Sequence, residues 1–152
     1  MMSTRSGFLR TTAAAGLVAL GLAGCGMMQS MSPGSESFTA ALSGAQEVPP
    51  VNTAASGNAE VTYNRNTGMA SYRVTYGGLS GAATAAHIHG PAGPGANAGV
   101  VVPLPNAASS PMTGEVKLTP EQFNQLASGQ YYVNVHTAAN PGGEIRGQLR
   151  RR

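Results

Sequence analysis

The sequence contains no aspartate and no tryptophan, and its single cysteine is Cys25. A single cysteine excludes an intramolecular disulfide, because a disulfide needs two thiols. Without aspartate a Ser-His-Asp triad cannot form, and no serine lies in a Gly-x-Ser-x-Gly elbow. The six glutamates lie mostly on alternating strand faces or in loops, with nothing to raise a pKa. Ordinary hydrolase chemistry is therefore not expected.

The start of the chain has the features of a lipoprotein export signal. Arg5 and Arg10 supply positive charge, and residues 11–21 are apolar but too short to span a bilayer core of about 30 Å. Small residues then precede Cys25 in the sequence Leu-Ala-Gly-Cys, which resembles the lipobox read by lipoprotein signal peptidase. We predict that residues 1–24 are a cleaved signal peptide and that Cys25 is lipidated.

Removal of residues 1–24 would leave seven basic and six acidic side chains, so the mature chain is almost neutral. Three of the seven are Arg150, Arg151 and Arg152, which we interpret as a short solvated tail and not as a nucleic-acid-binding face. The residue after the cysteine is Gly26 and not aspartate. By resemblance to the enterobacterial sorting rule, this favours the outer membrane of the cell envelope, with the lipid anchor in the membrane.

The composition changes at Phe38. Residues 25–37 are rich in Gly, Ser, Met, Gln and Pro without an apolar period, which predicts a flexible tether after the lipidated cysteine. Residues 38–150 form short alternating runs separated by Gly, Pro and Asn clusters, which is typical of one antiparallel sandwich or barrel. The clearest hairpin lies in residues 57–76, with its turn at residues 64–68.

We expect an all-β domain of about eight strands with one short helix. Besides the two arms of the hairpin, the alternating runs are residues 38–42, 83–89, 99–104, 113–118, 131–137 and 144–149. The helix is predicted to follow Thr119 as N-cap, with Pro120 at its first position and Gln122 at its third. Gly129 should end it.

All three histidines fall in two of these strands. In the run Ala-His-Ile-His, successive side chains of a strand lie on opposite faces, so Ala and Ile should face the core and His87 and His89 should face outward. The same rule sends His136, Glu144 and Arg146 outward from their own strands. If the strands are neighbours, three imidazoles share an external face with a carboxylate and a guanidinium. For Glu144 and Arg146 we expect a structural ion pair that locks the last strand, and no catalytic role.

Two explanations of the histidines stay open. Three neutral imidazoles with an open coordination position suit copper or zinc, so His87, His89 and His136 are a candidate copper site. Alternatively, these side chains hydrogen-bond the Gly- and Pro-rich loop at residues 90–98 and hold it against the sheet.

Four segments, in order, resemble the chordin-type, or CHRD, domain. They are residues 42–50 (Leu-Ser-Gly-Ala-Gln-Glu-Val-Pro-Pro), 86–91 (Ala-His-Ile-His-Gly-Pro), 132–137 (Tyr-Val-Asn-Val-His-Thr) and 141–148 (Pro-Gly-Gly-Glu-Ile-Arg-Gly-Gln). The resemblance covers residues 38–149. The family includes an animal growth-factor antagonist and many single-domain secreted bacterial proteins, and it has no established molecular function. The resemblance implies an immunoglobulin-like, Greek-key barrel similar to that of copper/zinc superoxide dismutases.

The dismutase resemblance extends to individual residues. His87 and His89 resemble the His-x-His copper pair of that enzyme, His136 resembles its later copper histidine, and Arg146 resembles the arginine that steers superoxide. The chain departs from the pattern, because it has no further histidine, no aspartate to hold zinc and no disulfide. The resemblance is therefore compatible with a three-histidine copper site but does not favour dismutase activity.

Three functional hypotheses follow. The first is a noncatalytic, membrane-anchored module that binds a protein partner in the envelope or outside the cell, because the chain has an anchor, a tether and no catalytic constellation. The second is a copper-binding protein for redox chemistry or metal handling, because the three histidines share one face. The third is a minimal dismutase-like enzyme, which the missing ligands disfavour.

Overall fold

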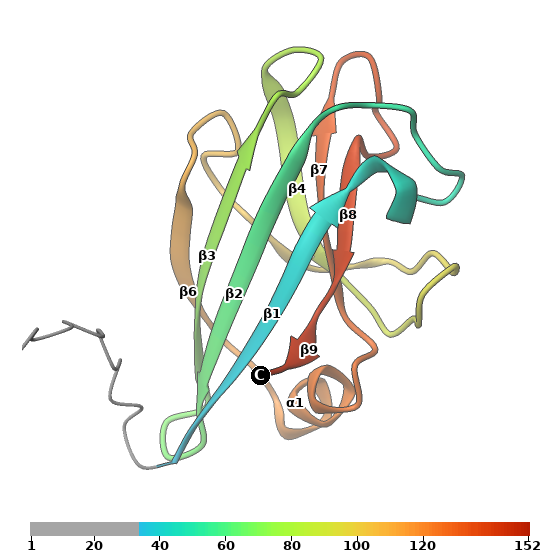
Figure 1. Ribbon diagram of the computed structural model, residues 1–152. Helices are drawn as coiled ribbons and strands as arrows, with labels where there is room; N and C mark the ends of the chain where they lie inside the picture. Colours follow the sequence, from blue (N-terminus) through green and yellow to red (C-terminus); the bar gives the residue numbers. More distant parts are fainter. Residues whose placement is uncertain (1–33) are drawn as a thin grey trace, which may run out of the picture. The chain divides into compact units, whose positions relative to one another are not determined.

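Strands dominate the computed structural model, which describes residues 34–152 (Figure 1). The predicted signal peptide, Cys25 and most of the predicted tether lie outside the described residues. The strands are β1 (Ser35–Ser43), β2 (Ser56–Asn64), β3 (Met69–Gly77), β4 (Ala83–His89), β5 (Val100–Pro103), β6 (Met112–Lys117), β7 (Tyr132–Thr137), β8 (Ile145–Gln148) and β9 (Arg150–Arg151). The helices are the 3₁₀ turn η1 (Gly44–Gln46) and the α-helix α1 (Pro120–Ala127).

The strands pair antiparallel in a nearly closed barrel. Their order is β5-β4-β7-β8-β1-β2-β3-β6, and β9 pairs with β1. Figure 1 shows β1, β2, β3 and β6 as one layer, with β4, β7 and β8 behind them. Neighbours such as β4 and β7, or β8 and β1, are distant in sequence, so the chain crosses between the layers. The predicted all-β antiparallel class, with about eight strands and one short α-helix, is confirmed.

Apolar side chains that alternate along the strands fill the barrel. In the β2–β3 hairpin, Val61 lies opposite Tyr72 and both are buried, whereas the neighbouring Arg73 is exposed. The alternation predicted for this hairpin is therefore confirmed. Aromatic rings close one end of the core, where Phe123 stacks on Tyr63 with ring centroids 4.2 Å apart. Large rings of this kind supply much of the buried area in a domain without tryptophan.

The α-helix forms where the sequence predicts it. The Thr119 hydroxyl accepts a hydrogen bond from the Gln122 N–H (3.2 Å), and the Gln122 side chain accepts one from the Thr119 N–H (2.9 Å). This capping box satisfies two backbone donors at the helix start. Phe123 and Leu126 are buried on the inner face, and Gly129 follows the helix with a φ of 71°. Among the described residues, no helix combines the length and apolar character needed to cross a bilayer.

The first and last strands differ from their predicted limits. β1 already begins at Ser35, so residues 35–37, which the sequence analysis assigned to the tether, pair with residues 62–64 of β2. The predicted final strand, residues 144–149, is shortened to β8, and β9 lies beyond its predicted end. Leu149 separates the two, with its N–H donating to the Tyr131 carbonyl (2.9 Å) and its side chain fully buried. β9 then pairs with the beginning of β1.

Glu144 is a buried carboxylate that ties three connecting segments to β7. Its oxygens accept hydrogen bonds from the Thr53 hydroxyl (2.8 Å), the Ser80 N–H (2.9 Å), the Ser80 hydroxyl (2.6 Å) and the Thr137 hydroxyl (2.7 Å). Burial alone would raise the pKa of Glu144, but the hydrogen bonds from Ser80, Thr137 and Thr53 outweigh it and lower the pKa to about 2. The charged form is therefore the one that the fold stabilises.

The predicted ion pair between Glu144 and Arg146 is not formed in the described part of the chain. Hydroxyl and N–H donors occupy the carboxylate, and the guanidinium donates to Asn97 and to backbone carbonyls of the β4–β5 connection. Glu144 and Arg146, two residues apart in sequence, thus have separate partners, because different loops cover each of them.

Glu144→Gln should destabilise the domain by roughly 2–4 kcal/mol, since it removes charge-assisted hydrogen bonds inside the protein. The folded pKa lies below the ordinary value of 4.5. The stabilisation is therefore complete above about pH 4.5 and is lost as the pH falls toward about 2.

Urea unfolding of wild type and Glu144→Gln at several pH values between about 2 and 7 would measure this contribution. Glu121→Gln, at an exposed position of α1, is the matched control and should leave the free energy of unfolding nearly unchanged. Identical pH slopes for wild type and Glu144→Gln would contradict the assignment.

Candidate metal centre

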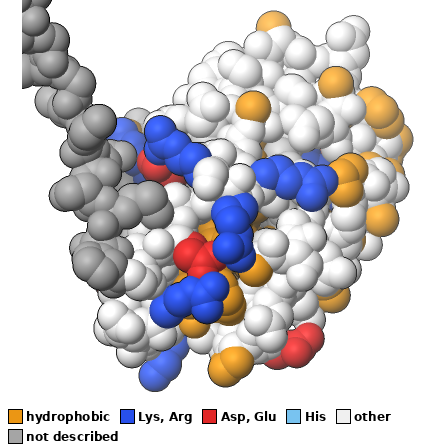
Figure 2. All heavy atoms as spheres, turned by 60° about the horizontal axis from the view of Figure 1, so that its bottom comes forward, with side chains coloured by type: hydrophobic (Ala, Val, Ile, Leu, Met, Phe, Trp, Pro, Cys, Tyr) orange, Lys and Arg blue, Asp and Glu red, His pale blue; other side chains and the backbone are white. Residues whose placement is uncertain are grey.

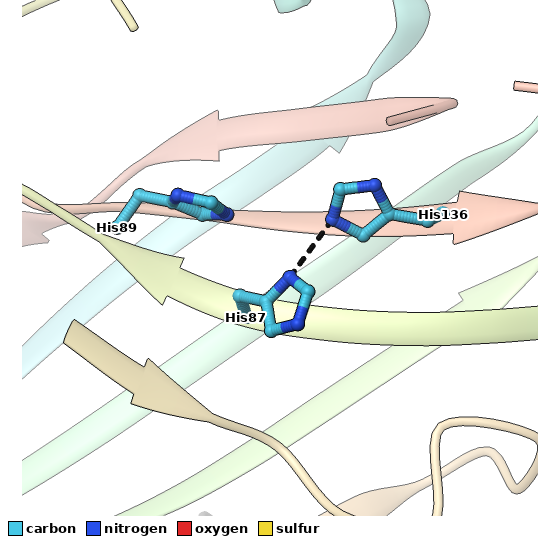
Figure 3. Close-up of side chains that lie close together, drawn as sticks. All are labelled: His87, His89 and His136. Atoms are coloured by element: carbon cyan, nitrogen blue, oxygen red, sulfur yellow. Dashed lines mark hydrogen bonds between the residues drawn. The ribbon is translucent and has the colours of Figure 1, made fainter. Parts of the chain in front are cut away.

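β4 and β7 bring three histidines to one face of the barrel wall. The two strands are antiparallel neighbours, with Ala85 opposite His136 and His87 opposite Asn134. His87 and His89 are two residues apart on β4, so both point away from the barrel interior. His136 joins them from β7 (Figure 3). The structure therefore brings together all three histidines singled out in the sequence.

The ring nitrogens converge. His87 Nδ1 lies 3.0 Å from His136 Nε2, the contact dashed in Figure 3. One nitrogen from each of the three rings can be chosen so that all lie within 4.8 Å of one another. Metal–imidazole bonds are about 2.0–2.1 Å long, so two nitrogens 3.0 Å apart can bind the same ion almost without moving. His89 would have to approach by roughly 1–2 Å.

Backbone carbonyls fix two of the three rings. His89 Nδ1 lies 2.9 Å from the Ala98 oxygen, and His136 Nδ1 lies 2.9 Å from the Pro141 oxygen. A carbonyl only accepts, so each Nδ1 carries the hydrogen and each Nε2 keeps its lone pair. The Nε2 atom of His89 is buried and has no hydrogen-bond partner in residues 34–152. A buried acceptor without a partner is unfavourable unless a ligand engages it.

The histidine face is not the external surface that the sequence analysis expected. His89 is 9% exposed and His136 is 8% exposed, while His87 is partly exposed. The β4–β5 connection (residues 90–99) and the β7–β8 connection (residues 138–144) supply the carbonyls that bind the two buried rings. The alternation is as predicted, but loops lie over the polar side chains and shield them from water.

The environment keeps two of the imidazoles neutral. Burial lowers the pKa of His87 below 6.5, and the neighbouring His136 and His89 lower it further. Burial also lowers the pKa of His136, with the Pro141 carbonyl opposing this effect and His89 adding to it. Neutral imidazole is the form that binds metal ions, so neither ring has to lose a net proton at neutral pH.

A three-layer stack holds His89 in place. Its ring is parallel to that of Tyr132, with centroids 4.9 Å apart and 4° between the planes. On the Tyr132 ring lies the guanidinium of Arg146, whose Cζ atom is 3.5 Å from the ring centroid. Arg146 is buried and donates to the Asn97 side chain (3.0 Å) and to the Ala96 carbonyl (2.7 Å). Of the three histidines, only His89 hydrogen-bonds the loop at residues 90–98, as the alternative explanation expected, and Arg146 adds further hydrogen bonds to the same loop.

A family model described as the CHRD domain matches residues 38–149, which include all three histidines and both strands that position them. The chain belongs to the CHRD domain family. The match confirms the resemblance carried by the four sequence segments. Comparison with curated proteins and with solved structures gave no match.

Glu47 is a buried carboxyl group of the CHRD domain that the sequence analysis did not single out. It is 5% exposed, and burial raises its pKa from 4.5 to about 7, with the positive charge of Arg146 opposing the rise. This contradicts the expectation that no glutamate has a raised pKa. Gly143 lies against the Glu47 carboxyl and leaves no room for a Cβ atom there. Glu47 lies in residues 42–50, but the groups that bury it are distant in sequence, so no local pattern reveals it.

In the metal-free CHRD domain, His87 and His136 should both titrate below pH 6.5. His89→Gln removes a group whose charge lowers both pKa values, so both titration midpoints should rise toward 6.5. NMR titration of the imidazole signals measures the midpoints. Glu121→Gln on the exposed side of α1 serves as the control. Midpoints that stay fixed or fall in His89→Gln would show that the assigned electrostatics are wrong.

Proposed function

We propose that this CHRD domain binds one copper ion through His87, His89 and His136. The observation that carries the proposal is the convergence of three imidazole nitrogens within 4.8 Å. A metal-ligating histidine usually donates its other ring N–H to a carbonyl or carboxylate, which fixes the tautomer. His89 and His136 already donate from Nδ1 to backbone carbonyls, which leaves Nε2 of each as a ligand atom. His87 Nδ1 donates to His136 Nε2 in the metal-free structure, and it would become the third ligand atom once its hydrogen moves to Nε2 of the same ring.

The donor set supports copper as the ion. The cluster contains imidazoles without a carboxylate or thiolate among the residues that the structure describes. Imidazole suits copper and zinc, and Cu(II) exceeds Zn(II) in the general order of divalent metal affinities. Three protein ligands leave a coordination position open for a small molecule. We assign the domain a role in binding or handling copper, because no neighbouring group is arranged as a nucleophile or an acid–base pair.

Titration with Cu(II) tests the site directly. The purified domain, residues 31–152, forms one compact unit and should bind one equivalent. Loss of a residue that only supports a metal ligand typically weakens metal binding roughly 10–100-fold. Loss of a ligand itself should weaken Cu(II) binding at least that much in each of the single variants His87→Ala, His89→Ala and His136→Ala. The triple variant should lose the one-equivalent site. Electron paramagnetic resonance should report nitrogen ligands in the wild type only.

The controls separate the site from general effects. Asn58→Ala, at an exposed position of β2, should bind Cu(II) like the wild type. Circular dichroism and thermal unfolding establish that each variant is folded. Competition with Zn(II) tests the preferred ion. If the folded triple variant binds Cu(II) as tightly as the wild type, the three-histidine proposal is wrong.

We also propose that the CHRD domain is held in the cell envelope by a lipid on Cys25. The support is the lipobox in the sequence, with its positive start, short apolar run and small residues before the cysteine. The anchor would confine the metal-binding domain to the neighbourhood of a membrane. Gly26 supports the outer membrane as that membrane, by resemblance to the sorting rule.

Metabolic labelling with a fatty-acid probe should mark the full-length chain, and Cys25→Ser should abolish the label and release the protein from membrane fractions. Ser30→Ala, in the same segment, is the control and should retain both. In an enterobacterial host, Gly26→Asp should move the protein from the outer to the inner membrane. An unlabelled wild-type chain would exclude the anchor.

A further inference from the structure

The cationic side chains of the CHRD domain are concentrated at one end of the barrel. Residues 34–152 contain seven Lys and Arg side chains. Figure 2 shows Lys and Arg side chains gathered where the lower end of Figure 1 comes forward. We call this group the basic end, and it consists of Arg65, Lys117, Arg150, Arg151 and Arg152.

Strand register explains why these residues meet. β1 and β3 begin at this end, and β2 and β6 finish there. Arg65 directly follows β2, Lys117 lies opposite Met69 at the start of β3, and Arg151 lies opposite Phe38 near the start of β1. Segments that are distant in sequence thus place their charges on one surface. The arginines at the end of the sequence belong to that surface and are not an isolated tail.

Carboxylates at the same end do not cancel this charge. Four carboxylates lie there, one fewer than the cations: Glu36, Glu60, Glu115 and Glu121. Glu36 lies beneath the guanidiniums of Arg65 and Arg151 and forms ion pairs with both. Its side chain is 13% exposed, whereas those of Arg65 and Arg151 are 54% and 52% exposed. With Glu36 shielded, the five exposed cations outnumber the remaining carboxylates, so the surface that meets solvent keeps an excess of positive charge.

Buried aromatic rings support two of the cations from below. The Arg65 guanidinium carbon is 5.0 Å from the centroid of Phe123, and that of Arg151 is 5.8 Å from the centroid of Phe38. Both rings belong to the core. The guanidiniums are thus placed by the core and by Glu36 before any partner binds, which reduces the ordering cost of binding.

The rest of the chain joins the barrel at the basic end, because Gly34 immediately precedes β1. At about 3.3–3.6 Å per residue, the segment between Cys25 and Gly34 reaches at most about 30 Å. A membrane attachment at Cys25 would therefore keep the basic end within about 30 Å of the lipid surface.

We propose that the basic end rests on anionic lipid headgroups. Anionic headgroups create a negative surface potential that attracts Lys and Arg within a Debye length of about 8–10 Å. Guanidinium groups also match phosphate oxygens with paired hydrogen bonds. The proposal is independent of copper binding, since none of the five cations contacts a histidine.

Cosedimentation of the non-acylated domain, residues 31–152, with vesicles tests the contact without a lipid anchor. Vesicles of phosphatidylcholine with phosphatidylglycerol should bind the domain at low salt, and pure phosphatidylcholine vesicles should not. Binding should fall steeply between about 0.05 M and 0.5 M NaCl. Each cation near an anionic surface contributes about 1 kcal/mol, so Arg152→Gln should lower the partition coefficient about fivefold at most. The triple variant Arg65→Gln/Lys117→Gln/Arg152→Gln should lower it at least tenfold.

Arg152→Lys is the matched control, because it keeps the positive charge at the same exposed position. It should change the partition coefficient by less than about twofold. An equal loss in Arg152→Lys and Arg152→Gln, equal binding to both kinds of vesicle, or binding insensitive to salt would overturn the proposal. Salt-dependent retention on heparin without any vesicle binding would also overturn it, in favour of a polyanionic partner other than lipid.

Discussion

Strand β7 is buried on both of its faces, and this constraint explains most of the polar chemistry of the domain. Val133 and Val135 fill the barrel interior, while Tyr132, Asn134 and His136 point to the opposite side and are buried as well. Water cannot satisfy polar groups on such a face, so their hydrogen bonds must come from other segments of the chain. The connections on either side of the face supply them. A strand with two buried faces therefore requires loops whose backbone groups are positioned to hydrogen-bond its polar side chains.

Donors and acceptors on this face are satisfied unequally. Both terminal nitrogens of Arg146 and the side-chain amide nitrogen of Gln148 donate to oxygen atoms in the loops. Apart from the ion-paired oxygens of Glu36, the buried polar atoms without hydrogen-bond partners in residues 34–152 are His89 Nε2, Glu47 Oε1, Asn134 Oδ1 and Gln148 Oε1. All four can accept a hydrogen bond or a cation. A face whose donors are occupied and whose acceptors are free favours a positively charged ligand, which agrees with a metal ion bound by the imidazoles.

The sequence predicts the direction of side chains better than their surroundings. Period-two alternation depends only on the local backbone, so the shared face of His87, His89 and His136 could be predicted without knowing the fold. Burial of that face depends on loops far away in sequence, and no local pattern reports it. The same limit explains the errors at Glu144 and Glu47, because the segments that surround each carboxyl join it only through the barrel topology.

The first strand shows a different limit of prediction. Ser35, Glu36 and Ser37 have no apolar period, and composition assigns them to the tether. They nevertheless pair with β2, and Arg65 and Arg151 flank the Glu36 carboxylate. Backbone hydrogen bonds and an ion-pair network extend the sheet beyond its apolar pattern, and composition alone cannot indicate this.

Metal affinity and loop order are linked in this architecture. The Ala98 carbonyl that accepts from His89 belongs to the connection that Arg146 and Tyr132 also hold. A bound ion that fixes the His89 ring therefore stabilises the closed loop, and by thermodynamic reciprocity the closed loop raises the affinity for the ion by the same factor. Opening of the loop frees the Nδ1 hydrogen and allows the other tautomer, which carries the hydrogen on Nε2 and cannot bind the ion through that atom. In the proposed metal site, the Gly- and Pro-rich connection over the imidazoles would therefore contribute to the affinity together with the imidazoles themselves.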